Sequence, residues 1–212
     1  MNKDKATPGV ARAPGPSVAD TLAADSRGAP QPLLDQAYEF LGDQDIDCSR
    51  YTSPQFAEQE FDRLWARCWQ WACREEHLQD VGDNYVYDIG PYSVIVVRSA
   101  PDCIEAFVNS CAHRATRILG GEGGGYNGRF TCPFHGWSWG LDGSLENVPA
   151  RWDFPHVGAD THSLQRVQCD TWGGFVFINL DPDARPLAEY LDVLPEHFKH
   201  FPLDRRRIRL HV

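Results

Sequence analysis

The sequence contains no long hydrophobic run and no excess of positive charge. No stretch approaches the roughly 18 consecutive apolar residues of a membrane-spanning helix. The 30 acidic side chains outnumber the 20 basic ones and give a formal net charge of -10, whereas nucleic acids and anionic membranes attract a basic face. The N-terminal residues also lack the apolar core of a signal peptide, and acidic Asp4 and Asp20 are unlike a transit peptide. We therefore expect a cytoplasmic protein without a membrane span or a nucleic-acid partner.

A regular set of paired cysteines is missing as well. The seven cysteines are odd in number and irregular in spacing, which argues against the disulfide framework of a small secreted domain. Hydrophobic residues make up 42% of the 212 residues, which is enough to build a real core. The chain is therefore expected to fold around apolar contacts, with its cysteines free for other roles.

Changes in composition divide the chain into four expected segments. Residues 1–32 are rich in Ala, Pro, Gly, Ser and Asp, so a disordered tail is predicted because little apolar surface offsets the entropy of ordering. Residues 33–76 are interpreted as a helical lead-in, and residues 77–182 as a β domain. Residues 183–212 form the last segment.

Local signals predict a mainly β fold with few helices. Ser53 as N-cap and Pro54 as first helical residue predict a helix of about four turns with an apolar stripe from Phe56 to Cys68. Short runs of β-branched and aromatic residues predict antiparallel strands, and residues 175–178 are expected to be buried throughout. The expected strands are 84–89, 93–98, 104–109, 129–131, 164–169, 174–179 and 205–212, with a loop over 120–128 and a helix over 186–197.

Two short cysteine-histidine motifs stand out within the β segment. Cys111 and His113 form the first, Cys132 and His135 form the second, and 18 residues lie between them. A zinc finger usually takes both cysteines from one motif and both histidines from a helix. One sulfur and one imidazole from each motif instead suit two irons, one held by two thiolates and the other by two imidazoles. Rieske-type ligation is the primary hypothesis, and a zinc site from the same side chains is the alternative.

The residues around both motifs resemble the N-terminal part of the α subunit of Rieske non-haem iron aromatic ring-hydroxylating oxygenases. The resemblance rests on residues 111–119, 132–143 and 172–179. It implies a Rieske-type antiparallel β-sandwich with two cluster-binding loops over residues 77–182 and an N-terminal helix. It also implies that the short helix-strand fragment of residues 183–212 is the truncated start of an α+β catalytic domain. The cofactor that it implies is one 2Fe-2S cluster, with the ligands Cys111, His113, Cys132 and His135.

The resemblance also implies a low reduction potential. Respiratory Rieske proteins carry an extra cysteine in each motif and a serine that hydrogen-bonds the cluster, and Thr116, Phe134 and Trp137 occupy those places here. Fewer hydrogen bonds to the cluster leave an added electron less stabilised, so we expect the low end of the range from about -150 to +300 mV. Arg114 and Trp137 are expected to lie next to the ligands.

The implied function is electron transfer. In the family, an NAD(P)H-dependent reductase or a ferredoxin passes electrons to the cluster and onward to a mononuclear Fe(II), where an aromatic ring is hydroxylated. Such an iron needs two histidines and a carboxylate, and Asp153, His156 and His162 do not match the family's D/E-x-x-H-x4-H pattern. We expect no catalytic residue in this chain and no hydroxylation by it alone.

The implied partners therefore include a catalytic domain or a neighbouring α subunit, with a homo-oligomer as one expected assembly. Two alternatives remain open. One is a stand-alone Rieske ferredoxin that acts as a carrier, and the other is a zinc-stabilised interaction module without a redox role.

Overall fold

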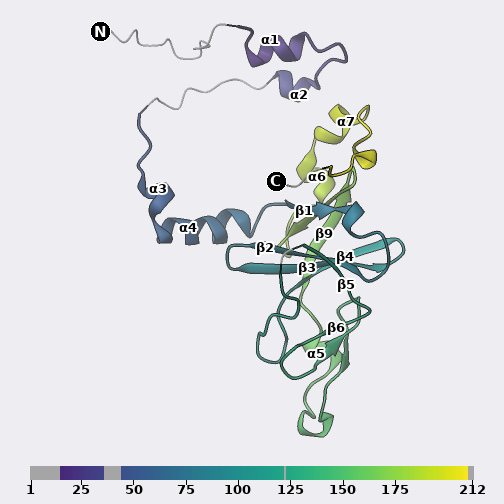
Figure 1. Cartoon of the computed structure of the whole chain (residues 1–212). Helices are drawn as coiled ribbons and strands as arrows, with labels where there is room; N and C mark the ends of the chain where they lie inside the picture. Colours follow the sequence, from purple (N-terminus) through teal and green to yellow (C-terminus); the bar gives the residue numbers. More distant parts are fainter. Residues whose placement is uncertain (1–14, 36–43, 122, 210–212) are drawn as a thin grey trace.

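The strands of the chain pair into two antiparallel sheets in the computed structural model, which describes residues 15–35, 44–121 and 123–209. One sheet has seven strands in the order β1-β10-β9-β4-β3-β2-β5, and the other has three in the order β6-β7-β8. Figure 1 shows the smaller sheet below the larger one. The strands are β1 Gln70–Arg74, β2 Asp83–Ile89, β3 Tyr92–Ala100, β4 Cys103–Val108, β5 Gly123–Tyr126, β6 Phe130–Thr131, β7 Ser138–Trp139, β8 Leu145–Asn147, β9 Arg166–Trp172 and β10 Phe175–Asn179.

The helices are short, and the predicted mainly β class is confirmed. None of those in the described ranges is long and apolar enough to cross a membrane. They are α1 Val18–Ala23, α2 Gln31–Leu34, α3 Ser49–Thr52, α4 Pro54–Glu60, α5 Ala159–His162, α6 Leu187–Leu191 and α7 Leu194–Phe198, with a π-helical turn η1 Phe61–Trp65 and 3-10 turns η2 Glu75–His77, η3 Arg151–Asp153 and η4 Leu203–Arg205.

Strand β3 lies between two hydrophobic cores. Val94 and Val96 pack with Ala106 and residues of β10, whereas Ile95 and Val97 pack with the residues around the two cysteine-histidine motifs. All four β3 side chains are completely buried, because alternate side chains of a strand point to opposite faces and both faces are covered here. The meander β2-β3-β4 predicted from the sequence is confirmed by the antiparallel pairing of β2 with β3 and of β3 with β4.

The helix predicted after Ser53 begins as expected but continues differently. The Ser53 hydroxyl accepts a hydrogen bond from the Phe56 amide at 3.2 Å, and α4 gives way to η1 after Glu60. On the apolar stripe, Leu64 is 49% and Trp65 is 37% exposed. Phe61 is half-buried, and its ring lies against Gly90 at the turn between β2 and β3, where an added Cβ would clash with it.

The glycine-rich stretch is a strand and not only a loop. Gly123–Tyr126 form β5, which pairs with β2 at the edge of the larger sheet. A side chain at Gly125 would lie 3.3 Å from the amide oxygen of Asn84, a buried residue that also donates a hydrogen bond to Asn127 at 2.9 Å. Glycine therefore allows β5 to lie close to the buried Asn84.

The apolar run of β10 is buried on one face only. Val176 and Ile178 are completely buried, whereas Phe175 and Phe177 are half-buried. Phe177 packs against a small group that includes Leu187 of α6. The expectation of complete burial was wrong for the two phenylalanines because only short helices cover their face.

The C-terminal part differs from its predicted helix and strand. The expected helix is divided into α6 and α7, with Asp192 at a positive φ of 49° between them. Residues 206–209 form no strand, and residues 210–212 lie outside the described range. The expected tail falls partly on residues 1–14, also outside that range, while Ser17 caps α1 further along. Disorder of the tail and the four segment boundaries stay predictions.

A buried arginine joins the end of the described chain to the larger sheet. Arg74 is 4% exposed and donates hydrogen bonds to the carbonyl oxygens of Gly173 at 3.3 Å, Leu203 at 3.0 Å and Arg206 at 2.7 Å. Its guanidinium also lies 4.3 Å from the ring centroid of Phe175, a favourable cation-π contact. The segment after η4 is thus held against the turn between β9 and β10.

Replacing this cation should release the segment. We expect Arg74→Met to lower the free energy of unfolding by about 2 to 3 kcal/mol, because three partly buried hydrogen bonds from a charged donor are lost. Trypsin should then cut faster after Arg205, Arg206 and Arg207, measured by mass spectrometry beside urea unfolding. The control Arg67→Met removes an exposed ion pair with Asp181 and should change stability by less than about 0.5 kcal/mol. Equal effects of both substitutions would contradict this role of Arg74.

Candidate metal centre

The first cysteine-histidine motif is a tight loop closed on its own cysteine. The Cys111 amide donates a hydrogen bond to the Thr116 carbonyl oxygen at 2.8 Å, and the Ala115 amide donates one back to the Cys111 carbonyl oxygen at 2.8 Å. Ala115 has a positive φ of 56°, which is unusual for a residue with a Cβ. The loop therefore satisfies the backbone groups of Cys111 while its side chain is buried.

The second motif repeats the same backbone pattern. The Cys132 amide donates to the Trp137 carbonyl oxygen at 2.8 Å, and the Gly136 amide donates to the Cys132 carbonyl oxygen at 3.1 Å. Gly136 has a positive φ of 73° at the position equivalent to Ala115. The two loops are thus local repeats that present one buried thiol each.

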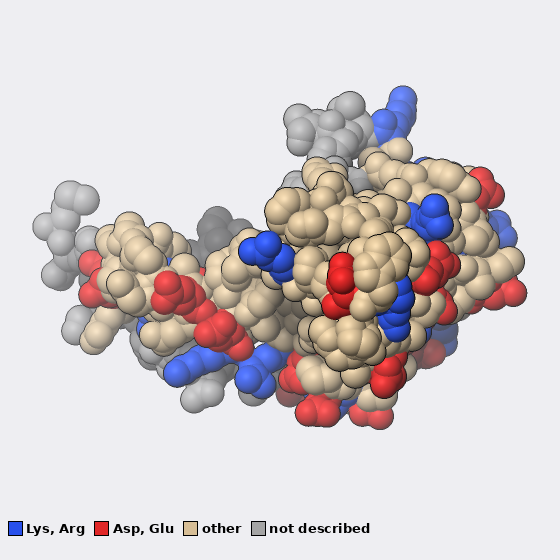
Figure 2. All heavy atoms as spheres, turned by 90° about the horizontal axis from the view of Figure 1, so that it is seen from below, with Lys and Arg blue, Asp and Glu red and all other residues tan. Residues whose placement is uncertain are grey.

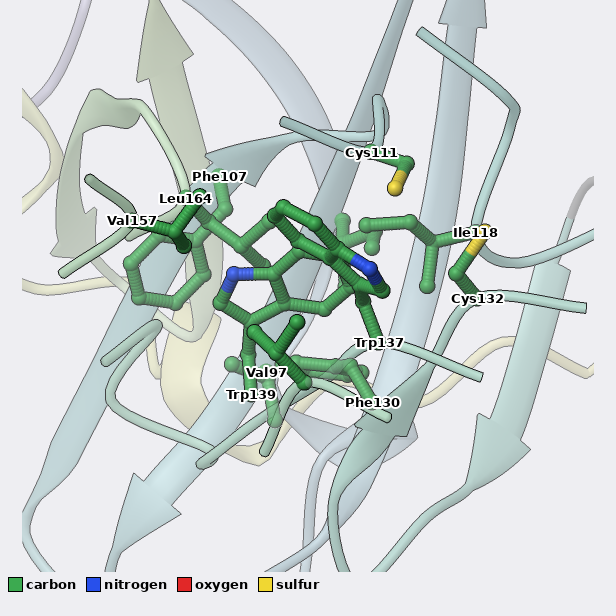
Figure 3. Packing of buried hydrophobic residues seen from close by; sticks show 12 residues of the cluster. Val97, Phe107, Cys111, Ile118, Phe130, Cys132, Trp137, Trp139, Val157 and Leu164 are labelled. Carbon is green, nitrogen blue, oxygen red and sulfur yellow. The ribbon is translucent and has the colours of Figure 1, made fainter. Parts of the chain in front are cut away.

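The two histidines occupy different positions in these similar loops, and their imidazole rings lie close to each other. His113 is the second residue after its cysteine and His135 the third, and their ring centroids lie 4.9 Å apart at 63°. Cys111 and Cys132 are 4% and 2% exposed, and Figure 3 shows both sulfur atoms at one edge of the core beside Ile118 and Trp137. The structure therefore brings the two predicted histidine ligands together, and it places the two predicted cysteine ligands beside each other in the core.

Burial shifts the pKa values of Cys111 and His113 in the first motif. It raises the pKa of the Cys111 thiol, and the neighbouring Cys132 acts in the same direction, while the backbone amides of His113 and Arg114 act against the rise. Burial also lowers the pKa of His113, with smaller contributions from the charges of His135 and Arg114. Metal ligation needs a neutral imidazole, and the lowered pKa of His113 favours that form. It also needs a thiolate, which Cys111 would become when a metal ion replaces its proton.

The aromatic surroundings of the two imidazoles differ. Trp137 is 2% exposed and stacks on His113, with centroids 4.7 Å apart and ring planes at 6°. His135 is exposed and is contacted by Phe134 at 3.9 Å between centroids. Trp137 therefore lies next to a ligand as predicted, while Arg114 is exposed and acts on His113 through its charge.

The donor set fits a two-iron cluster. The Nδ1 atom of His113 is buried and has no hydrogen-bond partner within the described part of the chain. A metal ion bound to this atom would explain the missing partner. No three Cys, His, Asp or Glu side chains among the described residues could hold one metal ion together. A zinc site needs three or four ligands on one ion, whereas each iron of a Rieske cluster takes two from the protein.

The other histidines form no such set. Asp153 lies in η3 and His162 in α5, and the ring centroids of His156 and His162 are 6.3 Å apart. These positions belong to the described range, where no three-ligand site is found. Whether a catalytic iron site is absent from the whole chain stays a prediction.

The comparison with protein families decides what kind of centre this is. The family described as "Rieske [2Fe-2S] domain" matches residues 68–163, which include both loops. This part of the chain is a Rieske domain.

Curated relatives of the Rieske domain are oxygenase subunits. The chain is 32% identical over 141 residues to the carnitine monooxygenase oxygenase subunit of Escherichia coli (strain K12), an alignment that covers 66% of this chain and 37% of that protein. It is 33% identical over 161 residues to the benzene 1,2-dioxygenase subunit alpha of Pseudomonas putida, with 76% of this chain and 35% of that protein covered. The chain thus spans about a third of the length of these relatives.

Solved structures of oxygenases are similar to this chain as well. A quaternary ammonium Rieske monooxygenase in complex with an inhibitor matches with a TM-score of 0.69 at 25% identity, over 76% of this chain and 45% of that one. A variant of naphthalene 1,2-dioxygenase bound to phenanthrene matches with a TM-score of 0.63 at 28% identity, over 68% and 33%. The predicted resemblance to the Rieske portion of oxygenase α subunits is confirmed.

Sequence reasoning missed the residue that positions the first loop of the Rieske domain. The buried Asn109, at the end of β4, accepts hydrogen bonds from the amides of Ile118 at 3.0 Å and Leu119 at 2.9 Å. It donates to the Leu119 carbonyl oxygen at 2.8 Å and to the Ser93 hydroxyl at 3.0 Å. Its only sequence signal is a polar residue at the end of an apolar strand, just before the cysteine.

The second loop is held by a hairpin instead of by one side chain. Phe130 pairs with Trp139 and Thr131 with Ser138 across β6 and β7, and both aromatic residues are completely buried. The Trp139 indole donates a hydrogen bond to the His162 carbonyl oxygen at 2.9 Å. The two loops therefore depend on different parts of the chain for their position.

Removing the Asn109 amide should loosen the first loop. We expect Asn109→Ala to lower the free energy of unfolding by about 2 kcal/mol, because the buried amides of Ile118 and Leu119 lose their acceptor. Iron bound per chain should fall with it, measured by metal analysis beside urea unfolding. The exposed Asn147 offers a matched control, because Asn147→Ala should change stability by less than about 0.5 kcal/mol. Unchanged iron content in Asn109→Ala would argue against a positioning role.

The positive φ of Ala115 predicts opposite effects of two substitutions. Ala115→Gly should leave stability unchanged or raise it by up to about 1 kcal/mol, because glycine adopts this conformation without strain. Ala115→Val should cost about 2 kcal/mol, since a branched Cβ is disfavoured at positive φ. Thermal unfolding measures both, and Ala112→Gly, at an ordinary φ, should destabilise. A stable Ala115→Val protein with full iron content would show that the loop tolerates another backbone conformation.

Proposed function

We propose that this chain carries electrons through a Rieske 2Fe-2S cluster as part of an oxygenase α subunit. Cys111 and Cys132 would hold one iron through their thiolates, and His113 and His135 would hold the other through neutral imidazoles. The convergence of these four side chains, with the buried Nδ1 of His113 left without another partner, carries the proposal. When bound, the cluster supplies a one-electron redox couple.

The surrounding residues favour a low potential for that couple. Thr116 and Phe134 stand where the respiratory type has its disulfide, and Trp137 stands where it has a hydroxyl donor. The Trp137 ring stacks on His113 at 4.7 Å, so an apolar surface takes the place of a hydroxyl donor. A low potential suits a donor to an iron that activates dioxygen.

The exposed imidazole of His135 offers the route by which a partner protein can exchange electrons with the centre. His135 is exposed while both cysteines are buried. Figure 2 views the molecule from the end that carries the smaller sheet in Figure 1, and acidic and basic side chains are interspersed there. At this end of the molecule, uncharged surface lies between charges of both signs.

The partners that we propose are those of the family. An NAD(P)H-dependent reductase or a ferredoxin would donate the electrons, and a mononuclear Fe(II) in a catalytic domain or a neighbouring α subunit would receive them. The solved structure of a quaternary ammonium Rieske monooxygenase concerns inter-subunit electron transfer in that enzyme, which supports a homo-oligomer. All seven cysteines are free thiols, as is usual in a reducing compartment, and this supports the cytoplasm as the location.

The substrate of the whole enzyme is proposed to be an aromatic ring. Relatives named for benzene, biphenyl and chlorobenzene support this class. Relatives named for carnitine and choline make a quaternary ammonium compound the alternative. A stand-alone carrier is less well supported, because these relatives are dioxygenase subunits and monooxygenases.

Metal analysis and electron paramagnetic resonance (EPR) test the proposal together. The full chain should be red-brown, contain about two irons and two sulfides, and give a Rieske signal after reduction with dithionite. Cys132→Ala and His135→Ala should each lose most of the iron and the signal, because each removes one of only two protein ligands of an iron. The matched controls Cys103→Ala and His156→Ala should keep both. Zinc in place of iron, or a signal of all-cysteine ligation, would refute the Rieske assignment.

A further inference from the structure

The imidazole of His113 is covered by aromatic side chains from two parts of the chain. Trp137 stacks on its face, and the Phe154 ring meets it edge-on, with centroids 5.7 Å apart and planes at 81°. Trp137 and Phe154 also contact each other at 5.5 Å and 83°. We call this pair the aromatic cover. His135 has no such cover within the described residues, since Phe134 beside it is itself 60% exposed.

The position of Phe154 is fixed by the backbone around it. Its amide donates a hydrogen bond to the Arg151 carbonyl oxygen at 3.0 Å, and its carbonyl oxygen accepts one from the Val157 amide at 3.2 Å. Val157 is 3% exposed and belongs to the same core as both cysteines. The partly buried Phe154 packs against that core, so its position in the aromatic cover is fixed by the fold of the domain.

Excluding water from His113 would affect how well the charge of a reduced cluster is stabilised. The formal charges of two ferric ions, two sulfides, two thiolates and two neutral imidazoles cancel, so the gain of one electron leaves a net charge of -1. Water dipoles stabilise that charge, and a dry, weakly polar surface stabilises it less. Solvent exposure is one of the factors that set the potential of iron-sulfur centres.

We propose that Trp137 and Phe154 keep the reduction potential of the centre low by excluding water from His113. Both residues would act indirectly, by covering the His113 imidazole, and neither is expected to bind iron. This inference rests on the proposed Rieske function and extends it to Phe154, a residue that lies 19 positions beyond His135 in the sequence. The exposed His135 then remains more open to solvent than the half-buried His113.

EPR-monitored redox titration of the full chain with its cluster, at one pH, tests the cover. Phe154→Ala should raise the potential by an amount that corresponds to about a tenfold change in the reduction equilibrium, or about 59 mV for one electron. Phe154→Leu, which keeps much of the volume, should raise it less. The matched control Phe134→Ala removes an aromatic contact from the imidazole that is already exposed, and it should shift the equilibrium by less than about threefold.

A second measurement needs no cluster. Diethylpyrocarbonate should modify His113 more slowly than His135 in the apoprotein, and Phe154→Ala should speed the modification of His113 alone, as followed by mass spectrometry. If Phe154→Ala fails to fold, Phe154→Leu and Trp137→Phe replace it in the same two measurements. Each should then raise the reduction potential and speed the modification of His113, and no change in either would contradict the role of the cover.

The results separate this inference from the proposed function. A Rieske EPR signal with an unshifted or lowered potential in Phe154→Ala would overturn the role of the cover and leave the function intact. Absence of a Rieske signal in the unsubstituted chain would overturn the function and this inference with it. Equal shifts in Phe154→Ala and Phe134→Ala would also overturn the cover, because water access would then not explain them.

Discussion

The closure of each loop on its own cysteine is the constraint on which the centre depends. A buried cysteine brings a backbone amide and a carbonyl with it, and those groups are costly if they lack partners. Two backbone hydrogen bonds within each loop satisfy them, at Thr116 and Ala115 in one and at Trp137 and Gly136 in the other. The thiols can therefore face the core side by side, and the imidazoles follow because each leaves the loop a fixed number of residues later.

The two loops need supports that they do not contain. Asn109 binds the first to the end of β4, and the hairpin of β6 and β7 holds the second. Strand β3 joins these supports to the rest of the domain, because its two faces belong to two different cores. The larger sheet and the centre therefore share one strand, whose side chains are packed on both faces.

The parts of the fold that could be predicted are those in which local chemistry and tertiary packing agree. The meander from β2 to β4 combines apolar runs with turn residues, and the N-cap at Ser53 needs only its own hydroxyl. The parts that could not be predicted depend on what covers a surface. Leu64 and Trp65 of the apolar stripe are exposed, and β5 lies so close to the buried Asn84 that a side chain at Gly125 would be 3.3 Å from its amide oxygen.

The sequence by itself determined the resemblance to oxygenase α subunits and predicted the four donors and their order, because ligand chemistry and loop spacing are local properties. Only the tertiary structure decided which residues serve them. Asn109 and Phe154 contact groups that are 9 and 41 positions away in the sequence, and no local pattern marks such partners. The difference in exposure between His113 and His135 has the same origin, since the two motifs are alike until the segment around Phe154 covers one of them.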